Sequence, residues 1–159
     1  MNKRLWLITP IVIIVLIAPL LIAMLLETFR PIISADEFIS RMENAGYTVE
    51  EQAHLFEQVD IYLVADCGAF YVEFIGHDSI ADARYTFSKL RSELEQLEQN
   101  LDTVYYYAWR SSGFSSWYSQ RTSDGQYARM IRIRSTIIFV STAYEHYVDV
   151  ADVLERLGQ

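Results

Sequence analysis

The chain has a single thiol, that of Cys67, and a thiol becomes a catalytic nucleophile when a nearby base activates it. Within the same predicted hairpin the one histidine is His77, which follows Ala69 by eight residues and so lies roughly 26 Å from it along an extended strand. The base would have to be His54 or His146, and no pattern places either of them beside the thiol. We therefore expect Cys67 to be a turn residue rather than a nucleophile.

No other motif for covalent or phosphate chemistry occurs in the sequence. It contains neither a Gly-x-Ser-x-Gly elbow nor a glycine-rich phosphate loop. We expect no catalytic residue and no cofactor, and an unrecognised metal-dependent enzyme is kept as an alternative. A single cysteine makes no internal disulfide, so the hydrophobic core must hold the fold together.

Two clusters of histidine and carboxylate residues have spacings that could hold a metal ion. They are His77, Asp78 and Asp82, and Glu145, His146 and Asp149. Residues three or four positions apart share a helix face; carboxylates alone suit Ca²⁺, and a mixed set suits a transition metal. Acidic residues in the first turn of a helix also complement its dipole. We therefore expect helix capping, and no metal, at either cluster.

Residues 105–119, YYYAWRSSGFSSWYS, concentrate four Tyr, two Trp and one Phe. Side chains of a strand alternate between the two faces of a sheet, so Tyr105 and Trp109 share one side while Tyr106 and Arg110 share the other. Both sides cannot be deep core, because Tyr hydroxyls and Trp N–H groups need partners. We expect one side to be core, and the other to be a surface whose aromatic rings and arginines suit a protein partner or a sugar.

The turn at Asp124-Gly125 predicts which residues face each other in the following hairpin. A two-residue turn there sets Trp117 opposite Arg132. It places Ile131 on the more apolar side, which should meet the helices, so Trp117 is expected to point outward. The candidate surface for a ligand or partner comprises Tyr106, Arg110, Trp117 and Arg132. A glycan or small-ligand binder that uses this aromatic face is the alternative to a protein-binding domain.

Three segments have the periodicity and capping signals of helices. They are residues 34–46, 78–100 and 142–158, which open with the capping-box pairs Ser34–Glu37, Ser79–Asp82 and Thr142–Glu145. In the second segment, apolar residues recur at spacings of four and three: Ala83, Phe87, Leu90, Leu94 and Leu97. We expect this stripe, with Leu90 and Leu94 at its middle, to be buried against a sheet.

Residues 59–77 are typical of a β-hairpin. With Cys67-Gly68 as a two-residue turn, Ala65 pairs with Phe70 and Leu63 pairs with Val72. That pairing gives one wholly apolar face.

Four further strands follow the long helix, with turns near 112–114, 123–126 and 134–135. The last strand is apolar on both faces at 137–140, which predicts a central position. The order of helix, hairpin, helix, four strands and helix predicts an α+β fold, an antiparallel sheet with packed helices.

The N-terminal segment LWLITPIVIIVLIAPLLIAMLL, residues 5–26, contains 22 residues without a charge. As a helix it would extend roughly 33 Å, which is enough to cross the hydrocarbon core of a bilayer. A cleaved secretory signal would have a shorter apolar region of about 7–15 residues and a small-x-small site, which the end of this run does not offer. We therefore expect one transmembrane helix that precedes the α+β domain.

The charges that flank this run predict its orientation. Lys3 and Arg4 precede it, whereas Arg30 follows it together with Glu27, so the N-terminus is expected in the cytoplasm. The expected organisation is a cytoplasmic stub at 1–4, a transmembrane anchor at 5–26, a tether at 27–33 and an extracytoplasmic domain at 34–159. The predicted location is the cell membrane, in a single-pass arrangement.

The charge of the outer region limits the partners it can take. Residues 31–159 contain 10 basic and 20 acidic side chains, a net charge of −10. That balance argues against nucleic acid and against docking to anionic lipids or wall polymers by charge. We expect the membrane itself, and a protein partner in or at the membrane, as the interaction partners.

The sequence resembles a broad group of small membrane- or lipid-anchored outer-surface domains of Gram-positive bacteria. The resemblance rests on Gly46-Tyr47 after a short helix, the hairpin 59–77, Asp78 with Ala83 nearby, and the final helix ending at Val153 to Gly158. It covers most of 34–159 and implies an extracytoplasmic α+β domain, with no activity and no catalytic residue to transfer. The layout is also similar to the fold of photosystem oxygen-evolving accessory proteins, as an analogy of fold alone.

Overall fold

The computed structural model describes residue 18 and the ranges 32–53, 57–99 and 104–159, with the backbone alone at 97–99 and 104–107. The chain divides into two units, 1–31 and 32–159, and the second contains the whole sheet. The predicted membrane span lies outside the described residues except for Ala18. No helix within the described part of the chain is long and apolar enough to cross a membrane.

The second unit is built on one antiparallel sheet of seven strands, the six that the alternation in the sequence predicts and one more, β1. The strands are β1 (Thr48–Glu51), β2 (Ile61–Asp66), β3 (Tyr71–Gly76), β4 (Val104–Ser111), β5 (Ser115–Thr122), β6 (Gln126–Ile133) and β7 (Thr136–Ala143). Their order across the sheet is β1-β2-β3-β7-β6-β5-β4. The strand β7 is central, as its two apolar faces predict, because it joins the N-terminal strands to the C-terminal ones.

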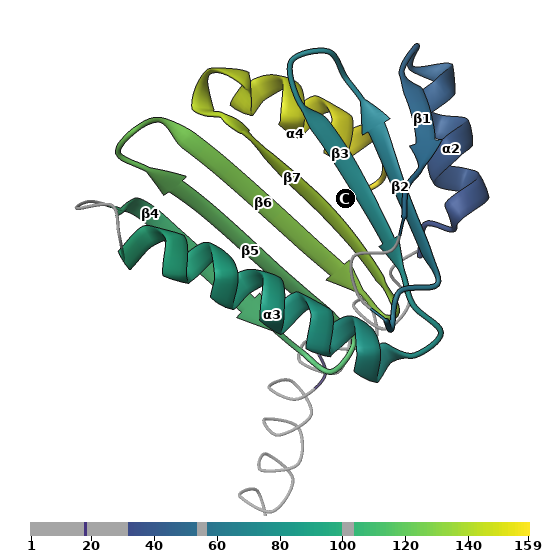
Figure 1. The fold of residues 1–159 in the computed structure, drawn as a ribbon, viewed down its shortest axis with the longest axis horizontal. Helices are drawn as coiled ribbons and strands as arrows, with labels where there is room; N and C mark the ends of the chain where they lie inside the picture. Colours follow the sequence, from purple (N-terminus) through teal and green to yellow (C-terminus); the bar gives the residue numbers. More distant parts are fainter. Residues whose placement is uncertain (1–17, 19–31, 54–56, 100–103) are drawn as a thin grey trace, which may run out of the picture. The chain divides into compact units, whose positions relative to one another are not determined.

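Three α-helices cover the sheet, which makes the fold α+β. They are α2 (Ala35–Asn44), α3 (Ile80–Gln99) and α4 (Tyr147–Arg156), and a 3-10 turn, η1 (Tyr144–His146), precedes the last one. The long helix α3 packs on one face, over β6 and β7, while α2 packs over β1 to β3 and α4 over β7 on the other face (Figure 1). The sheet therefore has a buried layer on each side.

The larger core lies between the sheet and the helices α2 and α4. It includes Phe38, Met42, Val72, Ile131 and Leu154. The smaller core lies under α3 and is formed by Val59, Ile75, Phe87, Tyr118, Met130 and Ile137. The predicted apolar stripe of α3 does face the sheet, but Leu90 and Leu94 are only half-buried, whereas Phe87 is 4% exposed.

The serines of the first two predicted capping boxes do cap their helices. The Ser34 hydroxyl accepts a hydrogen bond from the Glu37 amide at 3.2 Å, and Ser79 both accepts from the Asp82 amide at 3.1 Å and donates to its carboxylate. The third prediction is wrong, because Thr142 lies within β7 and α4 begins only at Tyr147. Strand pairing has extended to Ala143, which leaves η1 to make the connection.

The first hairpin keeps its predicted face but not its predicted turn. Four residues, Cys67 to Phe70, connect the strands, and the Cys67 amide donates to the Phe70 carbonyl at 3.0 Å. Ala65 therefore pairs with Val72, two residues beyond the predicted partner. A shift of two residues preserves the side-chain alternation, so the apolar face survives. The short strand β1, which the sequence did not reveal, extends this edge of the sheet.

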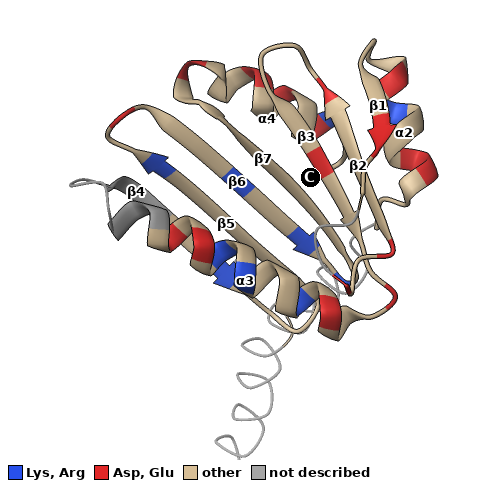
Figure 2. Cartoon of the chain, viewed as in Figure 1, with Lys and Arg blue, Asp and Glu red and all other residues tan. Residues whose placement is uncertain are grey.

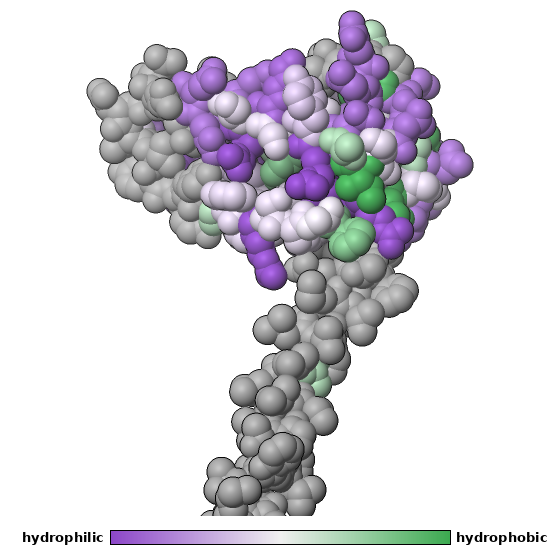
Figure 3. All heavy atoms as spheres, turned by 90° about the horizontal axis from the view of Figure 1, so that it is seen from below, coloured by the Kyte–Doolittle hydropathy of each residue, from purple (hydrophilic) through white to green (hydrophobic). Residues whose placement is uncertain are grey.

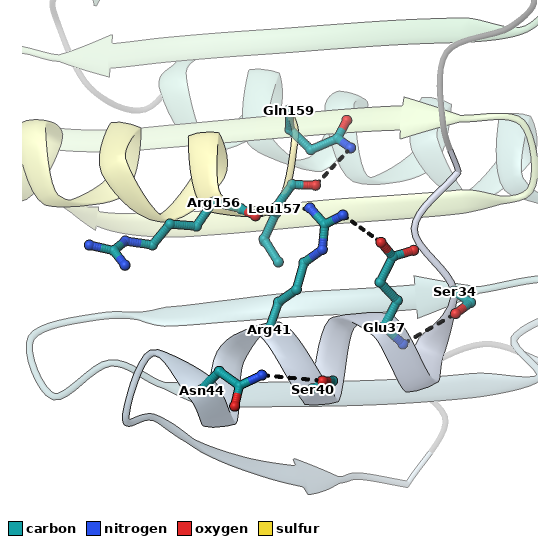
Figure 4. A network of polar contacts seen from close by, with 8 residues as sticks. All are labelled: Ser34, Glu37, Ser40, Arg41, Asn44, Arg156, Leu157 and Gln159. Carbon is teal, nitrogen blue, oxygen red and sulfur yellow. Dashed lines mark hydrogen bonds and ion pairs between the residues drawn. The ribbon is translucent and has the colours of Figure 1, made fainter.

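The C-terminus is fastened to α2 by a polar network (Figure 4). Arg41 forms an ion pair with Glu37 one turn earlier and donates a hydrogen bond to the Arg156 carbonyl at 2.9 Å. A guanidinium at the C-terminal end of a helix satisfies a carbonyl and complements the helix dipole. The contact joins the first and last helices of the domain.

Candidate functional site

Four side chains share the sheet face on the side of α2 and α4, at the end formed by β4, β5 and β6. The register pairs Arg110 with Trp117 and Trp117 with Ile131, whose side chain lies in the larger core. Arg121 and Arg129 lie an even number of residues from these positions on β5 and β6 and so point the same way. We call the surface formed by Arg110, Trp117, Arg121 and Arg129 the arginine face.

Arg121 and Arg129 are half-buried against the sheet, whereas Arg110 is exposed. The guanidinium of Arg121 lies 3.4 Å from the ring centroid of Tyr144, a cation–π contact that orients it. The Nε atoms of Arg121 and Arg129 are buried and have no hydrogen-bond partner among the described residues. Within the ranges 32–53, 57–99 and 104–159, no carboxylate forms an ion pair with either guanidinium.

The arginine face stands out because the rest of the domain is acidic. The segment 104–134 contains five arginines and one carboxylate, Asp124, although the region 31–159 has a net charge of −10. Figure 2 shows basic residues on β5 and β6 and also along α3, and acidic residues mainly on the helices and near β1 to β3. Because Arg121 pairs with Tyr127, Arg129 is its diagonal neighbour at about 7–8 Å. Like-charged side chains at neighbouring cross-strand positions disfavour each other, and an anionic ligand would relieve the repulsion.

Trp117 belongs to the arginine face, but its position differs from the prediction. It pairs with Ile131 instead of Arg132, and it is half-buried against the larger core. The loop between β5 and β6 has three residues, 123–125, with Gly125 at φ +83°, and a left-handed residue at that place is typical of a three-residue hairpin loop. The one-residue difference moves Trp117 to the face of Ile131.

Arg132 lies on the opposite face and is fully buried, which corrects its prediction as part of an outward surface. Its guanidinium donates hydrogen bonds to the carbonyls of Arg134 at 3.0 Å, Ser112 at 3.1 Å and Phe114 at 3.5 Å, and to the Ser116 hydroxyl at 2.9 Å. Burial, and to a lesser degree Arg84, lower the pKa of Arg132 to about 10, so it remains charged at neutral pH. Arg132 therefore joins the β4–β5 turn to the β6–β7 turn through hydrogen bonds.

The fourth predicted residue, Tyr106, has a described backbone only. The register pairs it with Arg121. Arg129 was missed by the sequence reasoning, and the missed signal was the length of the loop at Gly125. With a three-residue loop, the alternation along β6 assigns Arg129 to the same face as Trp117.

The Cys67 thiol lines a cleft of about 180 Å³ between the first hairpin and α4, together with Phe70, Asp149, Asp152 and Arg156. Burial, and secondly the neighbouring Asp66, raise the pKa of Cys67 to about 12. The thiol is therefore protonated at neutral pH, whereas a nucleophilic cysteine has a lowered pKa.

The two clusters whose spacings could hold a metal ion make other contacts. The two ring nitrogens of His146 face different carboxylates, Glu145 and Asp149, each at 3.5 Å, so the two acids lie on opposite sides of the ring. His77 contacts the Gln58 carbonyl through Nδ1 at 2.6 Å, and Asp82 caps α3. Within the described residues, no three His, Cys, Asp or Glu side chains gather as metal ligands.

Comparisons with protein-family models, with curated proteins and with solved structures find no match for this chain. The arginine face is therefore assessed by its own chemistry. Guanidinium groups are planar, always charged and weakly hydrated, and they bind carboxylates in a two-pronged arrangement. An indole among them offers a large apolar contact.

Proposed function

We propose that the chain is a membrane-anchored, extracytoplasmic, non-catalytic domain whose arginine face binds an acidic segment of a protein partner. The proposed anchor is the uncharged run 5–26, and the basic pair Lys3-Arg4 supports an orientation with the domain outside the cytoplasm. The observation that carries the binding role is the pair Arg121 and Arg129, two neighbouring guanidiniums that no described carboxylate neutralises.

The arrangement of charge favours a short acidic segment over a long polyanion. Electrostatic interactions are screened over about 8–10 Å at ordinary ionic strength, so the arginine face attracts only what lies directly on it. A long anionic polymer would extend beyond the face and over the acidic helices, where it would be repelled. A protein segment with a few carboxylates can occupy the face alone.

The composition of the face also suits a protein partner. Arginine and tryptophan are the residues that most often contribute strongly to protein–protein binding. Trp117 packs against the larger core. Its side chain therefore loses little conformational entropy when a partner covers it. Tyr144 supports Arg121 in the same way.

A photo-crosslinking amino acid in place of Ala108 tests this assignment in cells. Ala108 is half-buried on β4 and pairs with Ser119, so it lies on the arginine face without contributing a charge. We expect the full-length protein to crosslink from this position to a partner through an acidic segment, and Arg121→Glu with Arg129→Glu to abolish the product. The control position is Tyr71, which is 54% exposed on the other sheet face. Equal products from both positions, or capture of a segment without excess acidic residues, would count against the proposal.

The orientation of the chain has a separate test. Protease added to intact spheroplasts should digest residues 31–159, because only the four N-terminal residues are expected in the cytoplasm. Protection of the domain until the cells are lysed would show that it lies inside.

A further inference from the structure

Two large hydrophobic side chains are exposed at the end of the domain where the described chain begins. Ile32 is 38% exposed and Phe114 is 45% exposed. Ile33 packs beside Ile133 and Thr136, at the turn between β6 and β7. The Arg134 amide of that turn donates to the Phe114 carbonyl at 2.7 Å. The start of the domain, the β6–β7 turn and the β4–β5 turn therefore occupy one end of the sheet.

The turn that presents Phe114 is rigidly held. The buried guanidinium of Arg132 donates hydrogen bonds to the carbonyls of Ser112, Phe114 and Arg134. It therefore contacts both the β4–β5 turn and the β6–β7 turn. The Ser112 hydroxyl accepts from the Ser115 amide at 2.9 Å and closes the β4–β5 turn. The Phe114 side chain is 45% exposed and belongs to neither of the two described cores.

The sequence limits how far this end can be from a bilayer. Only residues 27–31 separate the apolar run, which ends at Leu26, from Ile32. Six residue steps reach at most about 22 Å even when fully extended, and the headgroup layer alone accounts for roughly 5–8 Å of that distance. An exposed isoleucine and an exposed phenylalanine thus lie within reach of the lipid surface.

We propose that this end of the domain, with Phe114 and Ile32, rests on the lipid bilayer and inserts both side chains into the headgroup–hydrocarbon boundary. The proposal depends on the membrane anchor of the proposed function but not on the arginine face. Figure 3, which shows the molecule from below the view of Figure 1, shows a group of hydrophobic residues among hydrophilic ones. Burial of a large apolar side chain in the interface is favourable in proportion to its area, and the anchor removes most of the entropic cost of bringing the domain to the membrane.

Contact with lipid would orient the domain with its strands rising from the membrane. The end that carries Tyr71 and the first hairpin would then point away from the bilayer, because Tyr71 and Gly76 are the opposite ends of β3. The arginine face would stand roughly upright, accessible to a partner beside it.

Fluorescent labels on the full-length protein in proteoliposomes test the lipid contact. The substitution Cys67→Ala removes the native thiol, and Phe114→Cys then carries an environment-sensitive label. Tyr71→Cys is the matched control, since both positions are exposed aromatic residues. Gly113→Cys serves as a second probe, because the space around that residue is open. The vesicles contain phosphatidylcholine and phosphatidylglycerol, with nitroxide quenchers at the headgroup boundary, and few protein copies per vesicle.

We expect the labels at 113 and 114 to lose fluorescence to the nitroxide lipids and to be shielded from aqueous iodide. The label at 71 should show the reverse. Equal quenching at all three positions, or shielding from iodide without nitroxide quenching, would overturn the lipid contact. Loss of the protein from the vesicles on alkaline extraction would overturn the anchor as well, whereas binding at the arginine face is measured independently of both.

Discussion

Glu73 is a carboxylate in the middle of the sheet, on the face that α3 covers in part. It pairs across the strands with Val64 and Phe139, and its Oε2 accepts a hydrogen bond from the Tyr62 hydroxyl at 2.8 Å. Burial raises the pKa of Glu73 above its ordinary value of 4.5, and the hydrogen bond from Tyr62 opposes that rise only in part. The same burial, with the charge of Glu73, raises the pKa of Tyr62.

The raised pKa of Glu73 in the folded state determines how the stability of the fold changes with pH. The folded protein holds the Glu73 proton more tightly than the unfolded chain does, so this group stabilises the fold fully below pH 4.5. That contribution is lost as the pH rises through the raised value. We expect Glu73→Gln to abolish this loss, so that the difference in melting temperature between variant and wild type grows with pH across this window. Glu50→Gln, which changes an exposed carboxylate on the same row of the sheet, should give no such trend. A difference for Glu73→Gln that does not vary with pH would refute the account of this group.

The strand β6 carries two arginines with opposite roles on its two faces. Arg132 is fully buried and bonded to three carbonyls, whereas Arg129 is half-buried and its Nε atom has no hydrogen-bond partner within the described residues. Arg132→Ala would remove the donor to the carbonyls of Ser112 and Arg134, at about 1–3 kcal/mol for each buried group left unpaired. We expect it to lower the free energy of unfolding by more than about 2 kcal/mol. Arg129→Ala should change it by about 1 kcal/mol or less. Chemical denaturation of both variants gives the comparison, and equal losses would contradict the assignment of the two faces.

The strand β6 also shows which features of the fold could be predicted from the sequence and which could not. Alternation predicted the strands, and capping pairs predicted α2 and α3, because those signals act over a few neighbouring residues. Which side chains of β6 share a face with those of β5 depended on the length of the turn at Gly125, where one residue more changed the register between these two strands. Trp117 and Arg110 were predicted on one surface and are neighbours there, but Arg132 was exchanged for Arg129 on the same strand.

Longer-range features were not predictable from local pattern. The strand β1 contains only Thr48–Glu51 and has two adjacent glutamates, so its alternation is too short to recognise. Its pairing with β2 is a tertiary contact. Likewise, the contact of Arg121 with Tyr144 joins residues that are distant in the sequence, and only the fold brings them together.

At the scale of the whole molecule, charge is separated along the sheet. The end with β4 to β6 is basic on one face, and the helices and the strands β1 to β3 carry most of the carboxylates (Figure 2). Such a division steers an acidic partner toward one surface and away from the others. It also predicts that binding depends on where the arginines lie and not on the net charge of the domain.

The most direct measurement of that claim is the binding of a fluorescent oligo-glutamate peptide to the full-length protein in nanodiscs, followed by fluorescence anisotropy. We compare Arg121→Glu with Arg129→Glu, as a double variant, against Arg84→Glu with Arg156→Glu, which makes the same change in net charge at exposed residues outside the arginine face. We expect the wild type to bind with an affinity that falls as salt rises, and the first double variant to lose at least about tenfold, or roughly 1.4 kcal/mol. The second double variant should retain most of the affinity. Equal losses in the two double variants would show that only net charge matters, and would contradict the arginine face as the binding surface.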